Sequence, residues 1–168
     1  MCWMSLSEPE DVYNVALSMR TKDYEEISAV RWEDDRETLA QNLANSFGDY
    51  HNVYSFGEGD ECIAIFCYVP QRIGVWSLGM FATDSFQKVG KFLTKRIIRD
   101  IIPALVRANA HRVEVQSICG YDEVHNWIRF LGLKEEAMLK SYGKNGEDFK
   151  QFSWTKNDPV KWSDEKCV

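Results

Sequence analysis

The stretch "TDSFQKVGKF", from Thr83 to Phe92, connects a strand-like run that ends in Ala82 to a helix-like run that begins near Val89. It is polar and contains one glycine, Gly90. Glycine lets the backbone approach another group closely, and the first turn of a helix offers N–H groups that favour an anion. The stretch therefore predicts a turn between strand and helix that could bind a phosphate.

The run after this stretch predicts an amphipathic helix. Its apolar residues recur every four positions with charged residues between them, at Leu93, Ile97, Ile101 and Leu105. This spacing places them on one face of a helix. Pro103 is expected to kink the helix or to end its regular hydrogen bonding nearby, because proline has no N–H to donate.

Basic residues gather around the start of this helix, at Lys88, Lys91, Lys95, Arg96 and Arg99. A solvated helix face carries charges of this kind, and so does a cluster that faces a phosphate. Both interpretations stay open from the sequence.

The run before the opening stretch has the pattern of a β-meander. From Val53 onward, two clusters of turn-forming residues, Gly57 to Asp60 and Pro70 to Gly74, divide three β-rich runs. We expect three antiparallel strands. Nearer the N-terminus, one helix is predicted to begin after Ser7, which can cap it, with Pro9 in its first turn. A further helix is predicted to end at Gly48.

The residues after the long helix predict a strand, a helix and a hairpin. The run from Arg112 to Ile118 alternates as a strand, and a helix over Tyr121 to Leu131 is expected to stop at Gly132. Asn145-Gly146 is the strongest hairpin signal in the chain. The tail from about Asn157 is expected to be loosely ordered.

The totals are those of a globular protein. A length of 168 residues suits a single domain, residues 1–168, and the apolar content of 45% is enough for a core. The net charge of −6 argues against a general nucleic-acid binder, because affinity for phosphates depends on clustered Lys and Arg.

Cysteines and histidines do not form a recognisable framework. The five cysteines are odd in number and include no C-x-x-C pair, so neither a zinc ribbon nor a complete disulfide set is expected. His51, His111 and His125 lie far apart, so no metal site is predicted. The N-terminus lacks the pattern of a signal peptide and the longest apolar run is too short for a membrane span, so we expect a cytoplasmic protein.

The order of elements and two short motifs resemble the GCN5-related N-acetyltransferase (GNAT) superfamily, from Glu8 to Lys156. The first motif is a turn of pattern Gln/Arg-x-x-Gly-x-Gly/Ala. Its matching residues are Gln87, Lys88, Val89, Gly90, Lys91 and Phe92. Phe92 replaces a small residue and could either crowd the phosphates or point into the core. The second motif, Trp127 to Leu133, resembles the family's aromatic-Tyr-x-x-x-Gly-Phe segment.

The resemblance implies an α+β fold with a central, mostly antiparallel, twisted sheet of about six or seven strands flanked by helices. It also implies acetyl-CoA as cosubstrate. The strand before the long helix would splay from its neighbour and bind the pantetheine arm through the backbone of Phe81, Ala82 and Thr83, while the turn would hold the pyrophosphate. Ordinary strand pairing and an ordinary turn are the alternatives.

The catalytic residues are harder to assign. Many members of the family have a tyrosine that protonates the departing thiolate, and Ile128 aligns with it and cannot donate a proton. Tyr121, Tyr142 or Cys119 could replace it.

A general base must lie near the strand ends. Asp84, Asp60, Glu61 and His125 qualify by position, although each could equally be a solvated turn or helix residue. The candidate catalytic residues are therefore Asp84, Tyr121 and His125.

Two functions stay open. The first is an N-acetyltransferase that moves acetyl directly from acetyl-CoA to a small-molecule or protein amine. Short strings such as Ile128 to Leu131 resemble small GNAT-like proteins of T7-type podoviruses, and the second function is a catalytically degenerate phage protein that modulates a host protein or serves virion assembly. We expect neither a nucleic-acid nor a membrane partner, no metal, and a monomer or a homodimer.

Overall fold

The structure, a computed structural model, describes residues 1–47, 52–160 and 162. The chain forms two compact units, and each unit is made of two segments that alternate along the sequence. The first unit comprises Met1–Tyr68 and Gly79–Leu93, and the second comprises Val69–Leu78 and Thr94–Val168. Two neighbouring strands and one helix therefore pass from one unit into the other.

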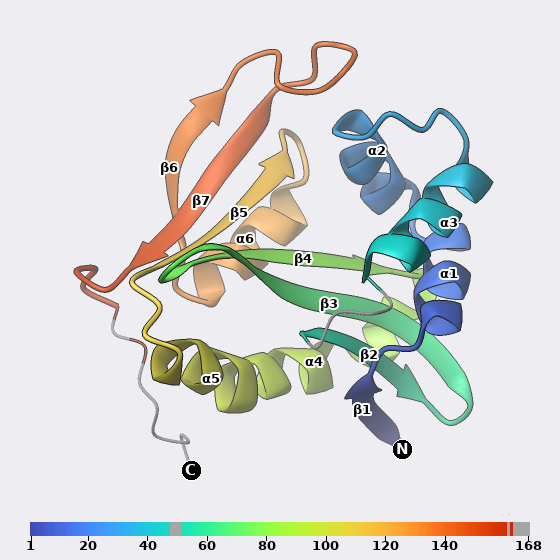
Figure 1. The fold of residues 1–168 in the computed structure, drawn as a ribbon, viewed down its shortest axis with the longest axis horizontal. Coiled ribbons are helices and arrows are strands. Elements are labelled where there is room, and N and C mark those ends of the chain that lie inside the picture. Colours follow the sequence, from blue (N-terminus) through green and yellow to red (C-terminus); the bar gives the residue numbers. More distant parts are fainter. Residues whose placement is uncertain (48–51, 161, 163–168) are drawn as a thin grey trace. The chain divides into compact units, whose positions relative to one another are not determined.

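Over the described residues, the strands form a seven-stranded sheet in the order β1-β2-β3-β4-β5-β7-β6 (Figure 1). Strands β4 and β5 pair in parallel, whereas the β1–β2, β2–β3, β5–β7 and β6–β7 pairs are antiparallel. The expected α+β fold with a mostly antiparallel sheet is confirmed. The bounds are β1 Cys2–Leu6, β2 Val53–Glu58, β3 Glu61–Arg72, β4 Val75–Ala82, β5 Arg112–Ile118, β6 Lys134–Leu139 and β7 Phe149–Thr155.

The first unit begins with a strand that the sequence analysis missed. Strand β1 pairs with β2 from Cys2 opposite Glu58 to Leu6 opposite Tyr54. Its local sequence has no clear alternation because this strand is partly exposed, and its partner lies far along the chain. Ser7 extends the strand, since its N–H donates to the Val53 carbonyl at 2.9 Å.

The helices of the first unit are α1 Pro9–Leu17, α2 Thr21–Ala29 and α3 Arg36–Phe47. The cap of α1 is Glu8 and not Ser7, because Ser7 belongs to the β1–β2 pairing; the Glu8 N–H donates to the Asp11 carboxylate at 3.4 Å. The predicted end of α3 at Gly48 lies outside the described residues.

The predicted meander is confirmed as β2, β3 and β4, with one difference. Strand β3 continues through Pro70 to Arg72. The ladder with β2 begins at Val53, which lies opposite Cys67, so Pro70 lies beyond it. The missing N–H of the proline therefore costs that ladder no hydrogen bond.

The long helix is built in three parts: α4 Gly90–Arg96, a π-helical turn Ile97–Ile101, and α5 Ile102–Arg107. The predicted apolar residues are all buried, with at most 2% of each exposed, at Leu93, Ile97, Ile101 and Leu105. Pro103 lies in the first turn of α5, directly after the π-helical turn. The predicted break in regular hydrogen bonding near Pro103 is thus confirmed.

The second unit ends with helix α6, Asp122–Phe130, and the β6–β7 hairpin. Gly132 follows the helix with φ +98°, as predicted for a helix stop. Asp148 holds the hairpin loop by accepting the Ser141 N–H at 2.8 Å, and Gly146 has φ +88°. The hairpin prediction is confirmed. No helix among the described residues is both long and apolar enough to cross a membrane.

Beyond β7 the chain makes defined contacts as far as Trp162. Asp158 pairs with Lys134 at 2.6 Å, and the Val160 carbonyl accepts the Trp154 indole N–H at 2.8 Å. Residues 163–168, the end of the tail predicted to be loosely ordered, lie outside the described residues.

Candidate cofactor and catalytic site

The stretch between β4 and the long helix forms the predicted turn. Thr83 caps a 3₁₀ helix, Asp84–Lys88, because its Oγ1 accepts the Ser85 N–H at 3.3 Å and its carbonyl accepts the Phe86 N–H at 3.1 Å. Val89, fully buried, then leads into α4. The turn is anchored at both ends, by the cap at Thr83 and by the Val89 side chain.

At the start of α4, the Phe86 ring packs so close to Gly90 that it leaves little room for a side chain there. A Cβ atom on Gly90 would lie 3.2 Å from Phe86 Cε1, closer than most side chains approach one another. The face of the Phe86 ring carries the Arg20 guanidinium, 4.7 Å from the ring centroid. The glycine therefore has a packing role here, in addition to any role in approaching a phosphate.

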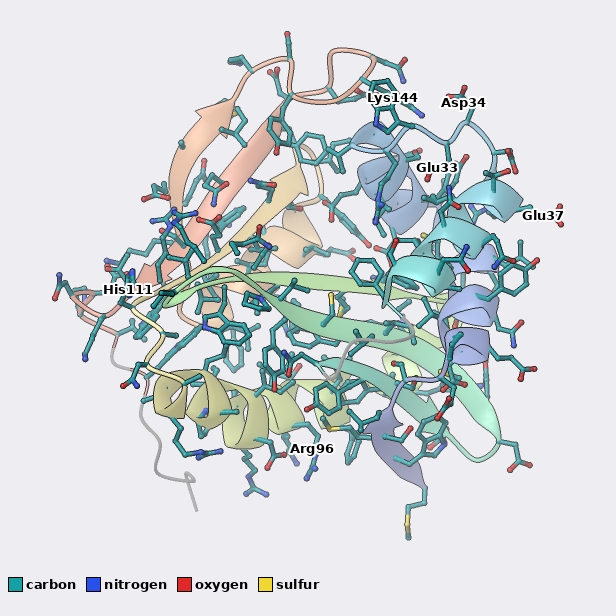
Figure 2. The ribbon with its side chains drawn as sticks, in the orientation of Figure 1. Glu33, Asp34, Glu37, Arg96, His111 and Lys144 are labelled. Carbon is teal, nitrogen blue, oxygen red and sulfur yellow. The ribbon has the colours of Figure 1, made fainter. Side chains whose placement is uncertain are left out.

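Carboxylates partly neutralise the basic residues around the turn. Lys88 Nζ lies 2.9 Å from Glu61 Oε2, and this hydrogen bond lowers the pKa of Glu61 and raises the pKa of Lys88. Arg96, labelled in Figure 2, pairs with Asp100 at 3.0 Å. A phosphate at the turn would compete with Glu61 for Lys88.

Phe92 packs against the sheet of the first unit. Its ring lies edge-on to that of Phe56 on β2, with the ring centroids 6.3 Å apart. An edge-to-face pair of this kind is favourable beyond the area that it buries. Of the two orientations that the sequence leaves open for Phe92, the structure shows the one directed into the packing.

The end of β4 is held by Arg20, directly before α2, and by Asp23 in the first turn of α2. The Ala82 N–H donates to Asp23 Oδ2 at 2.9 Å, and the Ala82 carbonyl accepts the Arg20 N–H at 2.8 Å. The Thr83 N–H donates to the Ile63 carbonyl at 2.9 Å. Both polar backbone groups of Ala82 are therefore used within the chain, and a pantetheine arm would have to displace Asp23 and Arg20 to reach them.

Asp23 is the residue of this site that sequence reasoning missed. Its side chain is only 4% exposed and accepts two hydrogen bonds from Arg20, from Nε at 2.9 Å and from Nη2 at 3.0 Å. The sequence signal is an Arg and an Asp three positions apart at the start of α2. That pattern is typical of a solvated helix end, and only the packing of β4 reveals that this pair is buried.

Three of the predicted site residues of the first unit differ in accessibility. Asp84 and Gln87 are exposed in the 3₁₀ helix, whereas Phe81 is buried with 5% of its surface exposed. Asp84 is thus open to solvent within its unit, as a general base for a soluble amine must be.

His125 lies in the interior of the second unit. Its Nε2 is 3.1 Å from the Ile118 carbonyl and 3.2 Å from Ser117 Oγ, and the ring packs on Phe152. Nδ1 has no hydrogen bond from any described residue and lies 3.8 Å from Asp122 Oδ1. Burial lowers the pKa of His125 most, and the positive charge of Lys150 lowers it further.

These contacts argue against His125 as a general base. A carbonyl can only accept a hydrogen bond, so the Ile118 carbonyl favours the tautomer with the proton on Nε2. With only 1% of its surface exposed, the ring is closed to a soluble substrate. The geometry supports a structural role for this side chain.

The position expected to hold the family's general acid carries no proton donor. Ile128 is 4% exposed on α6. Of the replacements, Tyr121 is buried at the start of α6, Tyr142 donates to Gln116 Oε1 at 3.2 Å, and Cys119 Sγ lies 3.4 Å from Met138 Sδ. Within residues 1–47, 52–160 and 162, no three His, Cys, Asp or Glu side chains gather as metal ligands would, and His51 lies outside these ranges.

The β4–β5 ladder ends early. It joins Val75–Ser77 to Arg112–Glu114, whereas β5 continues to Ile118. The last paired residue of β4 is Ser77, and the strand passes into the first unit at Gly79, two residues later.

Comparison with known proteins gives structural likeness without sequence likeness. No family model matches the chain, and no curated protein is significantly similar to it in sequence. The fold resembles the ribosomal-protein-S18-alanine N-acetyltransferase from Escherichia coli, with TM-score 0.64, 14% identity, and coverage of 92% of this chain and 94% of that one.

Two further structures agree. An N-acetyltransferase from Staphylococcus aureus Mu50 gives TM-score 0.69 at 11% identity, covering 92% of this chain and 98% of that one. The ribosomal-protein-S5-alanine acetyltransferase from Vibrio fischeri gives 0.64 at 17%, covering 96% and 95%. At these identities the likeness shows the fold, which is that of the GNAT acetyltransferases.

Proposed function

We propose that the protein is an acetyl-CoA-dependent N-acetyltransferase that acts on a small-molecule or protein amine. The observation that carries the proposal is the turn Thr83–Gly90, which lies between β4 and the long helix in a fold shared with acetyltransferases. The early end of the β4–β5 ladder supports it, because a parted strand can offer its backbone to a ligand.

In this proposal the turn holds the pyrophosphate of acetyl-CoA. The backbone of Gln87 to Phe92 approaches the phosphates, and Lys88 exchanges Glu61 for a phosphate oxygen. The amine nitrogen attacks the thioester carbonyl carbon, the C–S bond of the tetrahedral intermediate then breaks, and CoA leaves as its thiolate and takes a proton from solvent. The rate advantage comes from positioning the thioester and from backbone N–H groups that polarise its carbonyl, with Asp84 as general base.

A second function is favoured by two observations. The backbone groups of Ala82 are bonded to Asp23 and Arg20, and the buried Ile128 cannot protonate a thiolate. A GNAT-fold protein with these features could serve as a scaffold that binds another protein, such as a host protein or a virion component if the gene is carried by a phage.

Isothermal titration with acetyl-CoA, and with desulfo-CoA as a ligand without the thioester, separates the two functions. The enzyme should bind acetyl-CoA with a dissociation constant of about 1–100 μM. Gly90→Trp should weaken binding at least about tenfold, because the indole would fill the approach to the turn. Gln41→Trp, on the exposed face of α3, is the matched control and should bind like the wild type.

Circular dichroism establishes that each variant is folded. A folded Gly90→Trp variant with unchanged affinity would remove the turn from the proposal. If the wild type shows neither heat nor thermal stabilisation at millimolar acetyl-CoA, the scaffold function takes its place, and capture of binding partners becomes the next measurement.

A further inference from the structure

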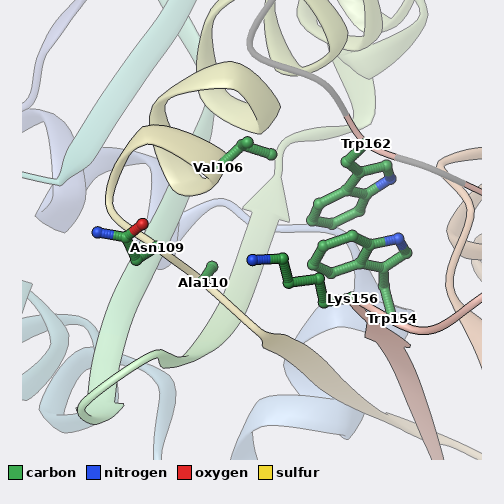
Figure 3. Close-up of a pocket in the computed structure, with 6 residues that line it drawn as sticks. All are labelled: Val106, Asn109, Ala110, Trp154, Lys156 and Trp162. Atoms are coloured by element: carbon green, nitrogen blue, oxygen red, sulfur yellow. The ribbon is translucent and has the colours of Figure 1, made fainter.

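A pocket of about 220 Å³ lies in the second unit and contains none of the residues assigned above. Its lining comes from the end of α5, the turn that follows, the end of β7 and the tail (Figure 3). The lining residues are Val106, Asn109, Ala110, Trp154, Lys156 and Trp162.

One wall of the pocket is a pair of stacked indoles. The rings of Trp154 and Trp162 are nearly parallel, with an interplanar angle of 6° and centroids 4.4 Å apart. Their N–H groups donate to the Val160 carbonyl at 2.8 Å and the Leu131 carbonyl at 3.0 Å. Both donors are used within the chain, so the rings present apolar surface to the pocket.

A residue distant from the tail in sequence fixes the position of Trp162. Gly132 has φ +98°, and a Cβ atom there would lie 2.9 Å from Val160 Cγ1 and 3.1 Å from Trp162 Nε1. Any side chain at position 132 would therefore push the tail away. The indole wall depends on this glycine as well as on the tail itself.

The opposite side of the pocket is a tight backbone turn. Asn109 has φ +56°, its N–H donates to the Val106 carbonyl at 3.0 Å, and the Ala110 N–H donates to the Leu105 carbonyl at 3.0 Å. The small side chain of Ala110 leaves space. The Lys156 backbone is fixed by a 3.0 Å bond to the His111 carbonyl, and its side chain runs past Trp154 and brings its ammonium into the pocket (Figure 3).

We propose that this pocket is a binding site for a small planar carboxylate with a single ring. A cavity of about 150 Å³ holds benzene, so the volume here accommodates one ring and its carboxylate but not a drug-sized ligand. The ring lies against the indole wall and Val106, and the carboxylate pairs with the Lys156 ammonium. This site is independent of the proposed acetyl transfer.

Benzoate is the probe, and the indole N–H signals of Trp154 and Trp162 in NMR spectra are the readout. Trp154→Phe and Trp162→Phe assign the two signals among the six tryptophans. Benzoate should shift both signals with a dissociation constant of roughly 0.1–3 mM. Lys156→Met, which keeps length and apolar bulk, should weaken binding about fivefold or more. Lys144→Met, in the β6–β7 loop at the other end of β7, should not (Figure 2).

Benzyl alcohol is the uncharged control ligand. It has the same ring without the charge, and it should bind more weakly than benzoate to the wild type and about equally to both lysine variants. The proposal is overturned if about 20 mM benzoate moves neither indole signal of the wild type, a concentration well above the expected range. It is also overturned if Lys156→Met, shown to be folded by its melting curve, retains full affinity for benzoate.

Discussion

His125 shows how one buried side chain can set the response of this protein to acid. Burial lowers its pKa in the folded state, so between about pH 6.5 and that lowered value the unfolded chain holds a proton that the folded chain does not. The free energy of unfolding should therefore fall as the pH is lowered through this window, and one titrating group limits the slope to at most about 1.4 kcal/mol per pH unit. Urea unfolding from pH 7.5 to 5 measures it.

His125→Gln should flatten this slope. The substitution should also lower the free energy of unfolding at every pH, because it disturbs the packing of residue 125 on Phe152. His111→Gln is the matched control for the loss of a histidine, because the His111 side chain is exposed. Equal slopes in the wild type and His125→Gln would show that the titration of His125 does not govern the acid response.

At the scale of an element, the end of β4 depends on a charged pair from the start of α2. Asp23→Ala should lower the free energy of unfolding by about 2–4 kcal/mol, because it leaves the Ala82 N–H and the Arg20 guanidinium without their buried acceptor. Asp23→Asn keeps an acceptor for Ala82 and should cost less. Urea unfolding gives both values, and Asp60→Asn, in an exposed turn, should stay within about 0.5 kcal/mol of the wild type.

If Asp23→Ala is no more destabilising than Asp60→Asn, the hydrogen bonds to Ala82 contribute nothing to stability. Binding of acetyl-CoA by the same variants adds a second comparison. Under the proposed enzyme function, Asp23→Ala releases the Ala82 N–H and should bind acetyl-CoA more strongly than the wild type, whereas Asp23→Asn, which keeps the acceptor, should bind like the wild type.

Elements with a strong local pattern could be predicted from the sequence. The long helix, the meander and the β6–β7 hairpin have their own periodicity or turn residues, and the turn before Gly90 follows from one glycine between two such runs. Strand β1 and the Asp23 pair could not be predicted in the same way. Each is specified by a partner distant in the sequence, β2 for the strand and Ala82 for the carboxylate.

At the scale of the whole molecule, the chain crosses between the two units three times, within β3, within β4 and within the long helix. Neither unit is a continuous piece of chain. When one unit unfolds, the strands and the helix that continue into the other unit are therefore disrupted as well. We expect a single cooperative thermal transition, in which the calorimetric and van't Hoff enthalpies agree.

A pair of glycine variants, one in each unit, tests this coupling. Gly57→Ala would place a Cβ against the Glu61 carbonyl in the first unit, and Gly74→Ala, at φ +72°, would place one against the His111 ring in the second. Each should cost at least about 2 kcal/mol and lower the midpoint by about 4–8 °C. If the two units are coupled, scanning calorimetry should show one transition for each variant, with its midpoint temperature below that of the wild type. Two separate transitions, with each variant lowering only its own, would show instead that the shared strands do not transmit unfolding from one unit to the other.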